Sequence, residues 1–314
     1  MPSRSDHFDG RRFFNPTGPP LQPLTAVPRL LLARRVPWPA RLDHVPTPVP
    51  GRDGAMAAVT FIGHATFLIQ AEAGNILTDP MFSKRAGPWN LFGPRRVRPP
   101  AIAFDALPSI SIVLLSHNHY DHCDGRTLRT LARRFDPIVI TPLGNAPLVR
   151  LVGLRRVEEL DWWQPAATTA LPITLTPAHH FSARGALDRN RALWGGFVIV
   201  AGRKRIYFAG DTAYAPFFAD VRHRLGPIDL ALLPIGAYEP RWFMKSVHMN
   251  PAEAAQAHLD LQARASIGMH FGTFQMTTEG IDEPLHALNR AREAQGVSEA
   301  LFRTLGFGET VFLH

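Results

Sequence analysis

Short apolar runs separated by turn residues make up most of the chain, and this pattern begins at about residue 59. β-Branched and aromatic residues gather in these runs, which is typical of β-strands. The run ISIVLLSH is apolar almost throughout, which indicates a strand buried on both faces. The strands are predicted at residues 59–70, 75–80, 110–117, 137–142, 173–177, 194–200, 205–209 and 229–234.

Helical segments are interleaved with these strands. They are predicted at residues 127–135, 146–151, 217–224, 251–263 and 284–294. Strands dominate each half of the chain, which favours two sheets packed face to face with helices outside, an α/β fold in four layers (an αββα sandwich). No linker divides this body, so we predict one domain at 56–314. It follows an extended N-terminal arm at 1–55, rich in proline and arginine.

Positive charge is concentrated in two places. The chain carries 34 basic and 26 acidic residues, a formal net charge of +8. Arginines crowd the arm, and a second basic cluster lies in the loop from Lys84 to Arg98. Such stretches suit phosphate groups of nucleic acids or lipid headgroups, although a solvated basic surface has the same appearance.

The sequence also limits the cellular setting. No stretch approaches the roughly 18 apolar residues of a membrane-spanning helix, and the N-terminus lacks the apolar core of a secretory signal. The one cysteine, Cys123, excludes an internal disulfide and a cysteine-rich zinc site. We therefore expect a cytoplasmic protein and leave open a peripheral position on the inner face of the membrane.

The segment SHNHYDHCD at 116–124 carries the strongest chemical signal. It starts where a buried strand is predicted to end, and side chains on such loops are held in place by the sheet. His117 and His119 alternate and can project together, which leaves Asp121 and His122 for a second ion. Imidazole and carboxylate ligands suit Zn²⁺, with iron or manganese as alternatives. A chance collection of histidines is a poor explanation for H-x-H-x-D-H at a strand end.

Further candidate ligands follow other predicted strands. TLTPAHH ends in His179 and His180, IYFAGDTAY contains Asp211, and SIGMHFGTF contains His270. Any one of them alone would suggest a structural role. Because a sandwich brings these strand ends to one edge, together they predict a site for two divalent metal ions.

The order H-x-H-x-D-H, lone His, G-D-T and late His resembles the ligand order of the metallo-β-lactamase superfamily. The segments TDPMFSKRAGPWNLFGPRRVRPP, PIGAYEPRWFMK and HMNPAEA are more specific. They resemble the N-acylphosphatidylethanolamine-hydrolysing phospholipases D and their bacterial relatives. This resemblance extends from about residue 59 to the C-terminus and leaves the arm outside it.

The resemblance implies a role for each candidate. One ion would be held by His117, His119 and His180, and the other by Asp121, His122 and His270. Asp211 would bridge them, and His180 rather than His179 would be the ligand. Asp121, Asp211 and His248 would be the catalytic residues. For contact with the substrate we expect His248, Tyr238, Trp242 and Lys245.

For two further residues, a purely structural role is the alternative to a role in supporting the metal ligands. Asp79 would accept a hydrogen bond from a ligand imidazole, but an aspartate before Pro80 can also simply form a turn. His64 lies in a strand-like G-H-A-T segment. We interpret it first as a core histidine, with support of a ligand as the second reading.

The expected activity is a metal-dependent phosphodiesterase of the phospholipase D type, which would hydrolyse N-acylphosphatidylethanolamine to N-acylethanolamine and phosphatidic acid. Two close cations can activate water and neutralise charge on a phosphodiester. The rivals are a hydrolase or lactonase of a small phosphorylated metabolite, with a small polar pocket, and a nuclease. Nucleases of this superfamily usually carry an inserted clamp, for which the segment between His180 and Asp211 leaves no room.

We therefore expect a phospholipid and an anionic membrane surface as partners, and no nucleic acid. The loop from Lys84 to Arg98 and its aromatic residues suit a membrane interface, and the N-terminal arm could add to that contact. Core packing explains the aromatic rings equally well. The oligomeric state is left open between a monomer and a homodimer.

Overall fold

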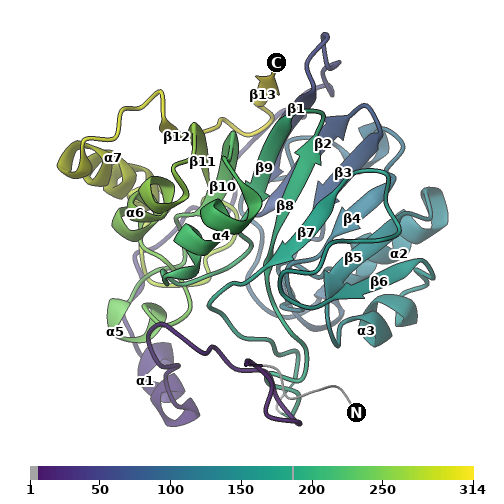
Figure 1. Cartoon of the computed structure of the whole chain (residues 1–314). Helices are drawn as coiled ribbons and strands as arrows, with labels where there is room; N and C mark the ends of the chain where they lie inside the picture. Colours follow the sequence, from purple (N-terminus) through teal and green to yellow (C-terminus); the bar gives the residue numbers. More distant parts are fainter. Residues whose placement is uncertain (1–5, 186) are drawn as a thin grey trace.

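The structure, a computed structural model, describes residues 6–185 and 187–314. Two β-sheets face each other across a hydrophobic core, and helices cover the outer face of each sheet (Figure 1). The four-layer αββα sandwich predicted from the sequence is confirmed.

The first sheet has the strand order β13-β1-β2-β3-β4-β5-β6. The strands β13 to β3 pair antiparallel in this order, and β3 to β6 pair parallel. Their bounds are β1 Ala57–Gly63, β2 Thr66–Ala71, β3 Gly74–Thr78, β4 Ile112–Leu114, β5 Ile138–Pro142, β6 Val157–Leu160 and β13 Thr310–Leu313.

The second sheet has the order β12-β11-β10-β9-β8-β7. Here β9 to β12 pair parallel, whereas β8 is antiparallel to both of its neighbours. The bounds are β7 Ile173–Thr176, β8 Gly196–Ala201, β9 Lys204–Phe208, β10 Leu230–Pro234, β11 Ala265–Met269 and β12 Phe302–Thr304.

Helices α2 (Gly125–Arg134) and α3 (Ala146–Leu151) cover the first sheet, and α4 (Phe217–Leu225), α6 (Pro251–Leu261) and α7 (Glu283–Gln295) cover the second (Figure 1). Two short helices, α1 (Val27–Leu31) and α5 (Arg241–Met244), lie together at the lower edge. The 3₁₀ turns are η1 Leu24–Ala26, η2 Pro88–Asn90 and η3 Phe104–Ala106. None of the helices in the described residues has the length and hydropathy that crossing a membrane would require.

Strand β4 shows why its run is apolar throughout. Ile112 and Leu114 point into the core between the two sheets, and Val113 points to the opposite face, where it packs with Leu128 of α2. Side chains alternate along a strand, so a strand covered on both faces needs apolar residues at every position.

The prediction was incomplete at several strands. The segment 59–70 is not one strand: it turns at Gly63, and His64 (φ 59°) lies in the tight turn between β1 and β2. The strand-like reading of the G-H-A-T segment was therefore wrong. Strands β6, β12 and β13 were not predicted, because short strands at or near sheet edges, such as VEEL of β6, keep polar residues.

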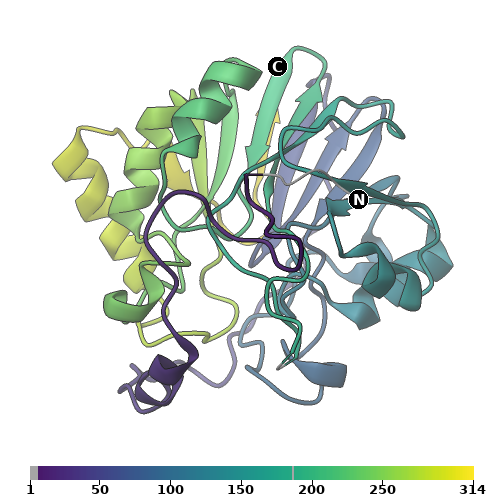
Figure 2. The same ribbon diagram turned by 60° about the horizontal axis from the view of Figure 1, so that its bottom comes forward.

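Residues 6–55 run along the edge where the loops with the predicted site residues lie, as the purple segment of Figure 2 shows. Phe13 is buried in the main core, and the Trp38 indole donates a hydrogen bond to the carbonyl of Glu279 at 2.8 Å. The division into an arm and a body at residue 55 stays a prediction, but the described part of the arm is packed against the body.

Candidate metal centre

Strands β3, β4, β7, β9 and β11 end at the same edge of the sandwich, and each is followed by a predicted site residue (Figure 1). Close packing of these loops demands small residues. A Cβ atom at Gly210 would lie only 2.6 Å from the Cβ of Ser116, and the φ of Gly210 is +62°. A glycine therefore precedes Asp211 because the loop after β9 must approach the loop after β4.

Three histidines converge at one side of this edge. His119 Nδ1 lies 2.9 Å from His117 Nε2 and 3.2 Å from His180 Nε2, and all three atoms could hold one ion. The other ring nitrogen of His180, Nδ1, lies 2.8 Å from the carbonyl oxygen of Val247. If Nδ1 carries the proton, Nε2 is left with a free lone pair facing the site.

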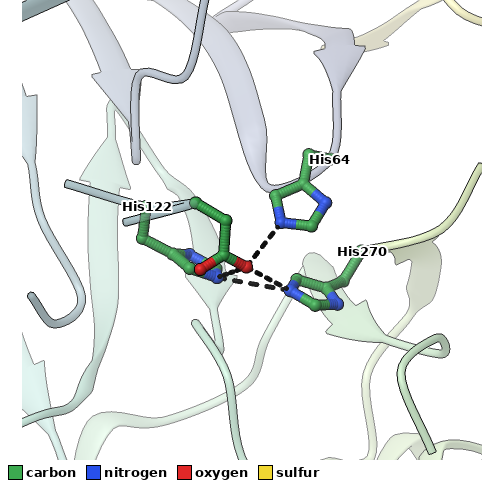
Figure 3. A group of neighbouring side chains, drawn as sticks. His64, His122 and His270 are labelled. Atoms are coloured by element: carbon green, nitrogen blue, oxygen red, sulfur yellow. Dashed lines mark hydrogen bonds and ion pairs between the residues drawn. The ribbon is translucent and has the colours of Figure 1, made fainter. Parts of the chain in front are cut away.

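A second group lies beside the first. His122 Nε2 is 3.2 Å from His270 Nε2 and 3.3 Å from Asp121 Oδ2. His270 Nε2 is 3.5 Å from the same carboxylate oxygen. Figure 3 shows the rings of His122 and His270 pointing toward one another, with His64 beside them.

Asp211 lies between the two groups. Its Oδ2 atom is 3.0 Å from His122 Nε2 and 3.2 Å from His270 Nε2 on one side. On the other side it is 4.0 Å from His117 Nε2 and 3.9 Å from His180 Nε2. Its second oxygen is buried without a hydrogen-bond partner among the described residues. This is the position that a bridging carboxylate would take.

The donor atoms fit zinc ions. In a tetrahedral site with Zn–N distances of about 2.0–2.1 Å, neighbouring ligand nitrogens lie about 3.3 Å apart. Burial lowers the pKa of His119 to about 3 and that of His180 to about 4, so both rings are neutral. Although burial alone raises the pKa of Asp211, the facing rings of His122, His270 and His248 hold it well below the usual range. Neutral imidazoles and an ionised carboxylate are the forms that bind a metal ion. Although burial opposes it, Asp211 and Asp121 raise the pKa of His122 and His270, so an ion at the second group would displace their protons.

Two residues, the carboxylate Asp79 and the imidazole His64, support the second group from behind. Asp79 Oδ2 lies 2.7 Å from His122 Nδ1 and also accepts a hydrogen bond from the Ser116 hydroxyl. Asp79 has a φ of 33°, so it forms the turn after β3 as well as contacting a predicted ligand. His64 Nε2 lies 3.0 Å from Asp121 Oδ2, and its carbonyl accepts from the amide of His270. The structure thus places both residues against predicted ligands.

A cavity of about 330 Å³ opens onto these side chains. His248 lines it, with Nε2 3.9 Å from Asp211 Oδ2. Apart from the predicted ligands, Tyr120 and Thr277, the rest of its wall is apolar and is formed by Leu30, Ala86, Phe181, Ala237, Phe243, Met244, Val247 and Met276. A larger cavity of about 770 Å³ lies on the far side of Tyr120, but none of the seven predicted ligands lines it.

The structure does not bring the other three predicted substrate residues to this cavity. Tyr238 is buried outside the wall, Trp242 lies under the guanidinium of Arg29, and Lys245 is exposed. The short helix α5 explains the positions of Trp242 and Lys245, because it turns Phe243 and Met244 inward and their neighbours outward.

Several wall residues were missed from the sequence. Leu30 belongs to the apolar run of the arm, which gave no sign of where it would dock. Phe181 directly follows His180, and its position next to a predicted ligand was a usable signal.

Comparison with known proteins gives the family. Residues 74–271 match the model of the β-lactamase superfamily domain. The chain is 38% identical over 263 residues to N-acyl-phosphatidylethanolamine-hydrolyzing phospholipase D 1 of Caenorhabditis elegans, covering 80% of this chain and 74% of that protein. It is 30% identical to a metal-dependent hydrolase of Solibacter usitatus, covering 72% of this chain and 89% of that protein.

The fold agrees with these matches. The structure of Igni18, a metallo hydrolase of Ignicoccus hospitalis, superposes with a TM-score of 0.60 at 22% identity and covers 82% of this chain and 98% of that one. The chain belongs to the metallo-β-lactamase superfamily of metal-dependent hydrolases, as a relative of the N-acyl-phosphatidylethanolamine-hydrolysing phospholipases D.

Proposed function

We propose that this protein is a phosphodiesterase of the phospholipase D type that hydrolyses N-acylphosphatidylethanolamine with two divalent metal ions, zinc being the best fit. The relative from Caenorhabditis elegans carries this activity in its name. The products would be phosphatidic acid and an N-acylethanolamine.

One observation carries the choice of substrate: the wall of the metal-facing cavity is apolar. Phe181, Phe243 and Val247 also line a neighbouring cavity of about 350 Å³, so the apolar surface continues beyond the metal-facing one. Polar ligands at the bottom and apolar walls above suit a phosphodiester that carries acyl chains. A small phosphorylated metabolite would leave these walls facing water, which weakens the first rival.

Bound ions would lower the pKa of a water molecule and neutralise charge on the phosphate oxygens. The predicted ligands would hold that phosphate at the bottom of the cavity, beside Asp211. Water would add to phosphorus and the bond from phosphorus to the ethanolamine oxygen would break. That oxygen then takes up a proton.

We assign His248 a contact with the phosphate rather than protonation of the leaving group. Burial holds the pKa of His248 well below its usual range. Bound cations nearby would lower it further, so the ring would be neutral at physiological pH. A neutral ring still donates a hydrogen bond to a phosphate oxygen, which is one of the two roles expected from the sequence.

Access to lipid requires a membrane-facing surface, and exposed apolar residues flank the cavity. Leu31 and Leu32, 68% and 87% exposed, follow the wall residue Leu30. Trp89 and Phe92, 81% and 59% exposed, follow Ala86 in the loop from Lys84 to Arg98. We propose that these two groups insert at the surface of an anionic bilayer.

The basic residues of this loop do not all face outward. Arg96 donates to the carbonyls of Met81 and Ser83 and stacks on Phe274, and burial lowers its pKa to about 10. Arg98 stacks on Phe307. Lys84 and Arg95 are both exposed, so these are the residues that we expect to contact lipid phosphates.

Turnover of purified, zinc-loaded protein against a panel of phosphodiesters tests the proposal. The panel contains N-acylphosphatidylethanolamine, plain phosphatidylethanolamine, bis-p-nitrophenyl phosphate and single-stranded DNA. We expect the N-acylated lipid to give the highest kcat/KM. Preference for a soluble diester over both lipids would favour the small-metabolite rival, and preference for DNA would favour a nuclease.

A further inference from the structure

The N-terminal arm reaches the metal centre itself. Asn15 Nδ2 donates a hydrogen bond to the main-chain carbonyl of His180 at 2.8 Å. The buried indole of Trp194 donates to Asn15 Oδ1 at 3.1 Å and to the carbonyl of Ala178 at 2.9 Å. Asn15 therefore joins the peptide of a metal-facing histidine to a tryptophan that is fixed in the core.

A second contact lies three residues further along the arm. The backbone of Gly18, with a φ of +95°, packs directly on the ring of His179. A Cβ atom at this position would lie 2.3 Å from His179 Cδ2, so the close approach requires glycine. The arm thus contacts both histidines of the loop after β7.

This loop depends on such contacts for its position. Strand β7 ends at Thr176, and residues 177–182 belong to no helix or strand. The His180 ring is held on one side by the carbonyl of Val247, and its peptide is held on the other side by Asn15. Together the two contacts fix the direction in which Nε2 points.

The arm is anchored before it reaches this loop. The amide of Phe13 donates to the carbonyl of Asn190 at 2.8 Å, and the Phe13 ring is buried in the main core. Asn15 therefore belongs to a segment whose backbone is already fixed, so forming its hydrogen bonds costs little additional conformational entropy.

We propose that Asn15 is a positioning residue for His180, so that docking of the arm and binding of an ion by His117, His119 and His180 stabilise each other. Such coupling is reciprocal: whatever the docked arm adds to metal affinity, the bound metal adds to arm docking. The inference rests on the metal site of the proposed function but not on its lipid substrate.

The test compares three variants by competition between the protein and a chromophoric zinc chelator. Asn15→Ala removes the amide. Asn15→Asp keeps its size and the acceptor for Trp194 but removes the donor to His180. In both variants the affinity for one of the two zinc equivalents should fall about 10- to 100-fold, as expected when a group that orients a ligand is lost. The affinity for the other equivalent should stay the same. On bis-p-nitrophenyl phosphate, kcat should fall while KM stays the same.

Trp38→Phe is the matched control. It also removes a 2.8 Å hydrogen bond from an arm side chain to a main-chain carbonyl, that of Glu279. It should keep the zinc affinity of the wild type even where it lowers Tm. Wild-type retention of both ions by Asn15→Asp would overturn the proposal, and so would an equal loss in Trp38→Phe.

Hydrogen exchange supplies the reciprocal measurement on the wild type. Zinc should slow exchange of the Phe13 and Phe14 amides, which donate to Asn190 and His7. Exchange that is identical with and without zinc would contradict the coupling. If lipid turnover is absent but both zinc readouts respond as expected, the proposed substrate fails and this inference stands.

Discussion

Asp79 Oδ2 lies 2.7 Å from Nδ1 of His122, and neither side chain is exposed to solvent. The contact joins the end of β3 to the loop after β4, and it points His122 Nε2 at Asp121 and Asp211. Asp79 is held in turn by the amide and the hydroxyl of Ser116. The turn residue therefore also sets the direction of a predicted ligand.

Replacing Asp79 by Asn should weaken the binding of an ion at the second group. The amide keeps the shape but loses the charge that stabilises a metal-bound imidazole, so we expect about 10- to 100-fold weaker zinc binding at one equivalent. Zinc competition measures this. Asp124→Asn is the control, since that buried carboxylate binds Ser83 and Thr127 instead of a ligand. Equal zinc loss in both variants would mean that Asp79 is structural.

The sequence predicted the sandwich and the strand ends that carry the candidate ligands, because buried strands and H-x-H-x-D-H are both local patterns. It could not predict the course of the arm. Asn15 donates to the carbonyl of His180, and Leu30 lines the same cavity as Val247, although these partners lie more than 100 positions away. Nothing in FFNP or RLLL encodes that distant partner.

Local shape also limited the prediction of substrate residues. Trp242 and Phe243 are neighbouring aromatic residues with similar sequence context. Only the turn of α5 decides that Phe243 faces the cavity and that Trp242 lies under Arg29. For the same reason Arg96 looked like a surface cation, although its guanidinium binds main-chain carbonyls.

Asp211→Asn should lose far more activity than His248→Ala. Asp211 Oδ2 lies within 4.0 Å of both groups of predicted ligands, so its loss would disturb both proposed ions. His248 would contribute one hydrogen bond to phosphate, so we expect a loss well below the roughly 10²–10⁴-fold typical of a general acid. Values of kcat on N-acylphosphatidylethanolamine decide this. Full activity with two ions in Asp211→Asn would refute the bridging role.

Trp89→Ser combined with Phe92→Ser should reduce binding to anionic vesicles about tenfold or more. Full burial of an aromatic ring is worth about 1.5–3 kcal/mol, and about 1.4 kcal/mol corresponds to tenfold. Vesicle sedimentation at low and moderate salt gives the partition coefficient. A variant with Leu259→Ser and Leu301→Ser changes two other exposed apolar residues and should bind like the wild type. Equal binding of both variants would exclude the proposed surface.

The arm should contribute more to stability in mildly acid than in alkaline solution. His7 Nε2 lies 2.7 Å from Asp161 Oδ1, and His7 Nδ1 lies 2.6 Å from Asp6. Burial alone would lower the pKa of His7, but these two carboxylates raise it above 6.5. The pKa of Asp161 is lowered below 3.8: burial opposes this, but the hydrogen bond with His7 outweighs it.

These two pKa shifts determine how the stability that the contact provides changes with pH. Stabilisation by His7 is complete below pH 6.5 and is lost as the pH rises through its raised pKa, while that by Asp161 is lost only as the pH falls below 3.8. The Tm difference between the wild type and His7→Gln should therefore be largest near pH 6 and shrink toward pH 9. A difference that grows with pH would show that protonated His7 does not hold the arm.

Hydrolysis of N-acylphosphatidylethanolamine in ¹⁸O-labelled water, with zinc added stepwise to metal-free protein, tests the central claim most directly. Mass spectrometry of both products gives the bond that is cleaved, and the titration gives the number of ions that activity requires. We expect ¹⁸O in the phosphate of phosphatidic acid, unlabelled N-acylethanolamine, and activity that saturates at two equivalents of zinc. Label in the N-acylethanolamine, or no release of it at two equivalents, would contradict the account.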